Sequence, residues 1–148
     1  MGKENPGYFQ PESKNIYFYN GEAMLEGELA PEGWKIPSDK DWEQLQEYIK
    51  DDVSTLKSGE WQPALDENAT VTDVNNYTHF NAFPLGIWSN EHLSPYMLTA
   101  FWSWDQERNA PSSNAFYLLG EENGFVKNSS FASGKDHYKA LSIRCIKE

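Results

Sequence analysis

The stretch 30–49 constrains the fold most, because it carries the signals of a helix with a defined start. Pro37 ends a short extended run, and Ser38 follows as an N-cap residue whose hydroxyl can accept a backbone N–H of the first turn. Asp41 stands three residues later, in the position of a capping-box acid. Apolar residues then recur at helical spacing, at Trp42, Leu45 and Ile49. We therefore expect an amphipathic helix of about three turns with one face on a core.

Short aromatic and β-branched runs fill much of the remaining sequence and predict strands. Aromatic residues make up 15 % of the chain, which excludes a chain that is disordered in bulk. We expect extended segments at 16–19, 34–36, 80–85, 87–88, 98–104, 115–119, 125–127 and 140–146. The run 98–104 is the densest in aromatic residues, so we expect it to be a central buried strand with Trp102 in the core.

Early helices followed by many short antiparallel strands place the chain in the α+β class. Residues 22–29 are expected to form a short helix or a loop, and residues 51–58 a short second helix with Val53 and Leu56 facing inward. We expect three tryptophans to share one interior: Trp34, Trp42 and Trp102.

The length of 148 residues suits one domain with its own core. We expect this domain to span 15–148, after a flexible leader or arm at 1–14 that is rich in Gly, Pro and charge. Residues 62–79 predict a long polar loop, of a size that is usually functional or disordered.

The formal net charge is −11, so the surface should repel nucleic-acid phosphates and anionic membranes. We therefore expect no nucleic-acid partner and no direct membrane contact. No run reaches transmembrane length, and the first residues hold no apolar signal segment. The single cysteine, Cys145, allows no internal disulfide, and its alternating apolar surroundings predict a buried, inert thiol.

Catalytic and metal-binding patterns are absent from the sequence. The histidines His79, His92 and His137 are scattered, and no zinc-type spacing occurs. No Gly-x-Ser-x-Gly elbow and no phosphate-binding loop occur either. We therefore expect no catalytic residues, no metal and no cofactor. The 23 acidic residues leave open a glycoside hydrolase that uses an acidic pair.

Two polar segments, 104–114 and 127–139, combine rigid aromatic rings with amides and charges. Such mixtures are typical of recognition loops, and a flat ring beside amides suits sugars. The alternative is that both segments are ordinary polar connections between strands. The candidate ligand-binding residues are Trp104, Asp105, Glu107, Arg108, Asn109, Asn114, Asn128, His137 and Tyr138, with Lys127 beside them.

Several motifs in a fixed order resemble the Fibrobacter succinogenes major paralogous domain. They are the segment Pro-Glu-Gly-Trp-Lys-Ile-Pro-Ser at 31–38, Leu56-Lys57, Trp61, Phe101-Trp-Ser103 and Leu141-Ser-Ile-Arg-Cys145. The resemblance covers about residues 17–147 and implies a C-type lectin-like fold, related to the formylglycine-generating-enzyme group. That group uses paired cysteines or copper-binding thiols, which one cysteine cannot supply, so its activity is not carried over.

The resemblance also implies an exported or surface protein of gut or fibre-degrading Bacteroidetes and their relatives. Related lectin-like domains act as adhesins and as variable ligand-binding proteins, some of them phage-borne. We therefore expect a non-catalytic recognition domain, extracellular or at the cell surface, that binds a glycan or protein ligand through 104–114 and 127–139. The alternatives are a structural module of a larger surface or phage protein, without a ligand of its own, and the acidic-pair hydrolase.

Overall fold

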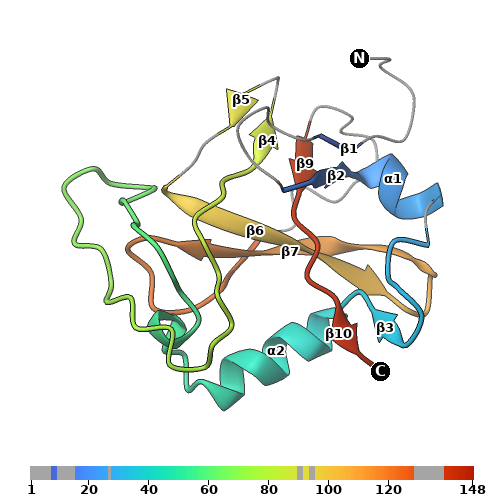
Figure 1. Ribbon diagram of the computed structural model, residues 1–148, viewed down its shortest axis with the longest axis horizontal. Helices are drawn as coiled ribbons and strands as arrows, with labels where there is room; N and C mark the ends of the chain where they lie inside the picture. Colours follow the sequence, from blue (N-terminus) through green and yellow to red (C-terminus); the bar gives the residue numbers. More distant parts are fainter. Residues whose placement is uncertain (1–7, 10–15, 27, 90–91, 94–95, 129–138) are drawn as a thin grey trace.

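The computed structural model describes residues 8–9, 16–26, 28–89, 92–93, 96–128 and 139–148 (Figure 1). Two α-helices and a 3₁₀ turn lie in this part of the chain: α1 (Gly21–Glu26), α2 (Asp39–Tyr48) and η1 (Val53–Thr55). The described strands form three sheets, and every strand pair is antiparallel. The α+β class is therefore confirmed.

The first sheet has the order β1-β2-β9-β4-β5, the second pairs β10 with β3, and the third has the order β6-β7-β8. The strands of the first sheet are β1 (Tyr8–Phe9), β2 (Phe18–Asn20), β9 (Lys139–Leu141), β4 (Trp88–Ser89) and β5 (His92–Leu93). The others are β3 (Trp34–Lys35), β10 (Ile146–Lys147), β6 (Leu98–Asp105), β7 (Ala110–Leu119) and β8 (Val126–Asn128).

The β6–β7 hairpin lies in the middle of the fold and is packed on both faces. Figure 1 shows α2 on one side of the hairpin, and α1, β2 and β9 on the other. Successive residues of β6 therefore enter opposite cores, with Phe101 on the α2 side and Trp102 on the α1 side. The result is three layers with a core on each side of the hairpin.

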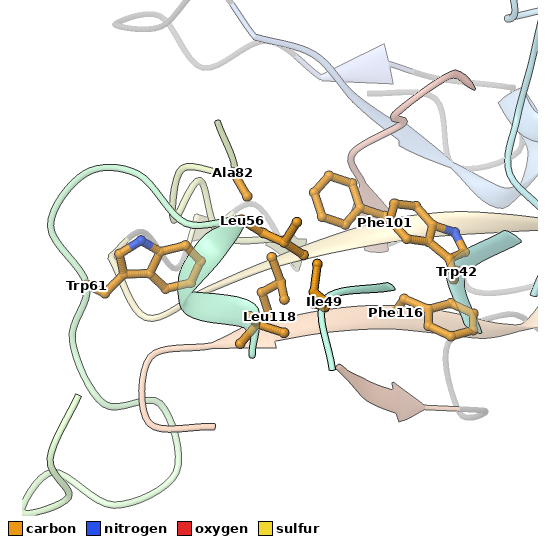
Figure 2. Packing of buried hydrophobic residues seen from close by; sticks show 9 residues of the cluster. Trp42, Ile49, Leu56, Trp61, Ala82, Phe101, Phe116 and Leu118 are labelled. Carbon is orange, nitrogen blue, oxygen red and sulfur yellow. The ribbon is translucent and has the colours of Figure 1, made fainter. Parts of the chain in front are cut away.

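The core on the α2 side is built from stacked rings. Trp42 is buried, with its ring centroid 5.1 Å from that of Phe101 and 5.8 Å from that of Phe116 (Figure 2). Such aromatic pairs contribute about 0.5–1.5 kcal/mol beyond the burial of their surface. This contact explains why α2 lies along the hairpin.

The helix α2 begins as its sequence predicts. The Ser38 Oγ accepts the backbone N–H of Asp41 at 3.2 Å, and the Asp41 carboxylate accepts the backbone N–H of Ser38 at 2.9 Å. Partial burial alone would raise the pKa of Asp41, but the Ser38 N–H and the Lys35 ammonium hold that pKa below its ordinary value. The capping box is therefore confirmed.

On the α1 side, Trp102 is 2 % exposed and packs with Met24 and Leu141. Its indole N–H donates to the backbone carbonyl of Tyr19 at 2.7 Å, which ties β2 to the hairpin. The prediction of Trp102 as a core residue is confirmed. The prediction that the three tryptophans share one interior is wrong, because Trp42 and Trp102 lie in separate cores and Trp34 is 44 % exposed.

The buried strand β6 lies at the edge of its own sheet and is covered by single bridges from three other segments. Gly86 N–H donates to the Leu98 carbonyl at 2.7 Å, and Ser142 N–H donates to the Ala100 carbonyl at 3.1 Å. Trp104 N–H donates to the Pro37 carbonyl at 2.9 Å. These bridges protect an edge that would otherwise offer unpaired backbone groups.

Three local expectations differ from the structure. Segment 80–85 is not a strand, because Asn81 has a φ of 59° and only Ala82 bridges to Lys57. Segment 140–146 is split into β9 and β10, which belong to different sheets. The expected second helix is only the single turn η1, although Val53 and Leu56 are both buried as predicted.

The polar loop 62–79 has no helix or strand, as predicted, but it is fixed to its surroundings. The Lys57 ammonium is buried and donates to the Leu119 carbonyl at 2.5 Å and to the Thr72 hydroxyl at 2.9 Å. The Glu121 carboxylate accepts the backbone N–H groups of Ala64 and Leu65 at 2.7 and 2.6 Å. This loop is therefore part of the frame.

Candidate functional site

A groove lies at the turn between β6 and β7. It has a volume of about 620 Å³ and is lined by Leu25, Glu28, Leu29, Ala30, Pro31, Glu32, Gly33, Trp34, Lys35, Ile36, Trp104, Gln106, Asn109 and Glu148. We call it the tryptophan groove, after Trp34 and Trp104. Its walls come from the α1–β3 connection, from the β6–β7 turn and from the end of β10.

The exposure of Trp34 follows from the turn that precedes it. The backbone N–H of Trp34 donates to the Pro31 carbonyl at 2.9 Å, and Gly33 has a φ of 80°, in the left-handed region that favours glycine. The chain beyond the turn pairs with β10 through Lys147. Because β3 lies in this two-stranded sheet outside both cores, the Trp34 indole is half exposed.

Trp104 reaches the groove from the hairpin. The register of β6 against β7 shifts between Trp102 and Trp104, which marks a bulge. Trp104 is half-buried and packs against the core on the α1 side. One part of its ring is thus held by the core while another lines the groove.

The groove is acidic. Its charged residues are Glu28, Glu32, Glu148 and Lys35, and the Lys35 ammonium lies 3.1 Å from the Asp41 carboxylate. Within the described part of the chain, the side chains of Glu28 and Glu32 form no hydrogen bond or ion pair. The same holds for the amide side chains of Gln106 and Asn109. Two indoles therefore lie beside exposed polar groups that have no side-chain partner among the described residues.

The predicted binding residues at the turn have different roles. Trp104 and Asn109 line the groove, whereas Asp105 and Arg108 stabilise the turn itself. The Arg108 Nε donates to the Asp105 carboxylate at 2.7 Å, and the second Asp105 oxygen accepts the backbone N–H groups of Glu107 and Arg108 at 3.1 Å. The Arg108 side chain holds the pKa of Asp105 below its ordinary value.

The expected loop 104–114 is shorter in the structure, because β7 begins at Ala110. Asn114 lies in that strand and donates its amide to Asp39 at the start of α2. The Ser103 hydroxyl donates to the same carboxylate at 2.5 Å, and the Lys127 ammonium lies 3.9 Å from it. Asn114 and Lys127 therefore belong to a polar cluster at the start of α2.

Three further candidates are not described in full. Asn128 is the last residue of β8, and only its backbone is described. His137 and Tyr138 lie outside the described residues.

Sequence reasoning missed Trp34, Glu28 and Glu32 as candidates. Trp34 was assigned to the core because it lies next to an apolar extended run. The signal that could have corrected this is the turn Pro31-Glu-Gly33 directly before it, which turns the chain at the surface.

No group of three or more His, Cys, Asp or Glu side chains gathers in a metal-binding arrangement among the described residues. The Cys145 thiol is half-buried, less than its sequence predicts, and this burial raises its pKa. None of the described helices has both the length and the hydropathy that a bilayer crossing requires.

The model of the Fibrobacter succinogenes major domain matches residues 4–147, and the chain therefore belongs to this family. No curated protein matches the chain. No solved structure matches it either.

Proposed function

We propose that this member of the Fibrobacter succinogenes major domain family is a non-catalytic recognition domain that binds a glycan in the tryptophan groove. The observation that carries the proposal is the pair Trp34 and Trp104 in one groove with carboxylates and amides that have no partner among the described residues. A rigid frame that leaves such groups unsatisfied at one place is suited to recognition.

The chemistry of the groove favours a neutral sugar. Indole faces cover the apolar C–H faces of a sugar ring, while carboxylate and amide oxygens accept hydrogen bonds from its hydroxyl groups. The three glutamates, Glu28, Glu32 and Glu148, disfavour an acidic sugar through like-charge repulsion. The volume of about 620 Å³ lies within the range of small-ligand sites, about 300–1,000 Å³.

We further propose a C-type lectin-like fold and a location outside the cell or at its surface. The motif resemblance supports both proposals, and the order of early helices and later antiparallel hairpins is compatible with the fold. The absence of a disulfide is no obstacle, because two aromatic cores hold the frame.

The test is a glycan array probed with the wild type, Trp34→Ala and Trp104→Ala. Loss of one indole should weaken binding about tenfold or more, since truncation of a tryptophan at the centre of a binding surface typically costs about 2 kcal/mol or more. Tyr48→Ala is the matched control, because Tyr48 is an aromatic residue of α2 that is 78 % exposed and outside the groove. Absence of binding to every neutral glycan would overturn the proposal and favour a structural module or a protein ligand.

The acidic-pair glycoside hydrolase is the second candidate, and the gathering of Glu28, Glu32 and Glu148 in one groove favours it. Incubation of the wild type with the bound glycan distinguishes the two functions. Release of a reducing sugar that Glu32→Gln abolishes would establish the hydrolase, whereas an intact glycan supports recognition without catalysis.

A further inference from the structure

A second groove, of about 310 Å³, lies along the outer edge of β6. It is lined by Ile16, Tyr17, Tyr19, Asn81, Ala82, Phe83, Leu85, Thr99, Phe101, Ser142, Ile143 and Arg144. Figure 1 shows the segments before β4 and after β9 crossing the hairpin, and both bridge to β6, through Gly86 and Ser142. We call this groove the arginine groove, and it shares no residue with the tryptophan groove.

Among the described residues of this lining, Arg144 alone is charged. Its guanidinium carbon lies 4.3 Å from the centroid of the Phe80 ring, which meets the Phe101 ring edge-on at 6.2 Å. Stacking on a ring that is itself packed against the core restricts the movement of the guanidinium. The cation is therefore held in place before any ligand binds.

No described acidic residue balances the charge of Arg144. The chain carries 23 acidic and 12 basic residues, yet none of the described lining residues is an acid. Arg144 forms no ion pair or hydrogen bond with the other described residues. Half-burial lowers the pKa of Arg144, but a guanidinium stays protonated in proteins. A half-buried cation without a counterion costs free energy, which an anionic ligand would recover.

The remaining lining suits the rest of a sugar ring. Tyr17 and Phe83 are 43 % and 48 % exposed, so their rings can cover an apolar sugar face. The Ser142 hydroxyl lies two residues before Arg144 in the same segment and can donate to or accept from a ring hydroxyl. The small volume limits the occupant to about one or two rings.

We propose that the arginine groove binds the carboxylate of a hexuronic acid residue, with Arg144 as its bidentate partner. This site is additional to the neutral-sugar site and does not depend on it. The domain would then bind two chemically different sugars of an acidic polysaccharide.

The test is a calorimetric titration of the full chain with glucuronic acid at neutral pH, with glucose and the methyl ester of glucuronic acid as uncharged probes. Glucuronate should bind about tenfold more tightly than either uncharged probe, because only it can form the charge-assisted pair. Arg144→Gln should remove this preference. Arg108→Gln is the matched control, because Arg108 is an exposed arginine outside the groove.

Two further variants keep the test decisive if Arg144→Gln does not fold. Arg144→Lys keeps the charge but cannot form a bidentate pair, so glucuronate binding should fall by about three- to tenfold. Ser142→Ala leaves the backbone bridge to β6 intact and should weaken glucuronate binding about two- to fivefold. Equal binding of glucuronate and glucose by the wild type, or an unchanged preference in Arg144→Lys, would overturn the proposal.

Discussion

The connections beside the two ends of the β6–β7 hairpin differ in how their polar side chains are bonded, although Asp105 and Arg108 bond within the turn itself. At the base, where β6 starts and β7 ends, Lys57 and Glu121 are bonded to backbone groups and fix the loop 62–79. At the turn, Glu28 and Glu32 line a groove and bond to no other described residue. Both ends are rich in polar residues, so composition does not separate them. Hydrogen bonding does: polar side chains hold the loop at the base, whereas the exposed Glu28 and Glu32 beside the turn are left to solvent or to the ligand proposed above.

The largest effect is expected from Gly120→Ala at the base. An added Cβ would lie 2.0 Å from the backbone carbonyl oxygen of Gln62, which cannot move away without the loop. We expect a loss of about 3 kcal/mol in the free energy of unfolding, measured by urea denaturation. Gly124→Ala is the matched control, because its nearest neighbour would lie at an ordinary 3.6 Å. Equal stability of the two variants would show that the loop is not fixed.

A pH dependence is expected at the same end. Burial lowers the pKa of Lys57 from 10.5 to about 8, although the charges of Glu121 and Glu122 act in the opposite direction. Between these two pH values the unfolded chain binds the proton that the folded chain has lost, so the free energy of unfolding rises with pH. The expected gain in the free energy of unfolding across this pH range is about 1–3 kcal/mol.

Lys57→Met isolates this effect, because methionine fills similar space without a titrating group. Urea denaturation of both proteins between neutral pH and about pH 10 should show the rise only in the wild type. Parallel stability curves would mean that the Lys57 ammonium reaches solvent.

At the turn end, Gly33→Ala should cost about 1 kcal/mol, because alanine is strained at a φ of 80°. No atom within 4 Å would obstruct the added Cβ, so the cost is conformational. Thermal denaturation measures the cost, and the glycan array measures the accompanying displacement of Trp34. An unchanged melting temperature with unchanged binding would contradict this description of the turn.

The smallest effect is expected from Arg108→Ala. The pair with Asp105 is exposed, and such pairs contribute little to stability because solvent screens them. Glycan binding should change less than about twofold, since Arg108 does not line the tryptophan groove. A loss of glycan affinity as large as that caused by Trp104→Ala would show that Arg108 belongs to the binding site, as the sequence suggests.

Local signals made α2 predictable, because its start is determined by Ser38 and Asp41, which lie within four consecutive residues. The hairpin was predicted only in part. Ser112 and Asn114 resemble loop residues, but Asn114 is bonded to Asp39, which is 75 residues away in sequence. Sequence patterns cannot show such distant partners, so they could not separate a polar strand from a loop.

The same limit explains the site. Trp104 and Asn109 were predicted because both belong to one polar segment, and both line the groove. Glu28 and Glu32 come from a segment more than seventy residues earlier, and the bridge from Pro37 and Ser38 to Trp104 brings that segment near the turn. Trp34 was misassigned because an apolar run does not reveal whether its sheet adjoins a core.

The most direct test of the account follows the indole N–H signals of the six tryptophans by nuclear magnetic resonance. The labelled domain is titrated with the neutral glycan that binds best on the array. The account predicts that the signals of Trp34 and Trp104 shift with added glycan, while those of the buried Trp42 and Trp102 stay in place. Binding that leaves both Trp34 and Trp104 unshifted would contradict it.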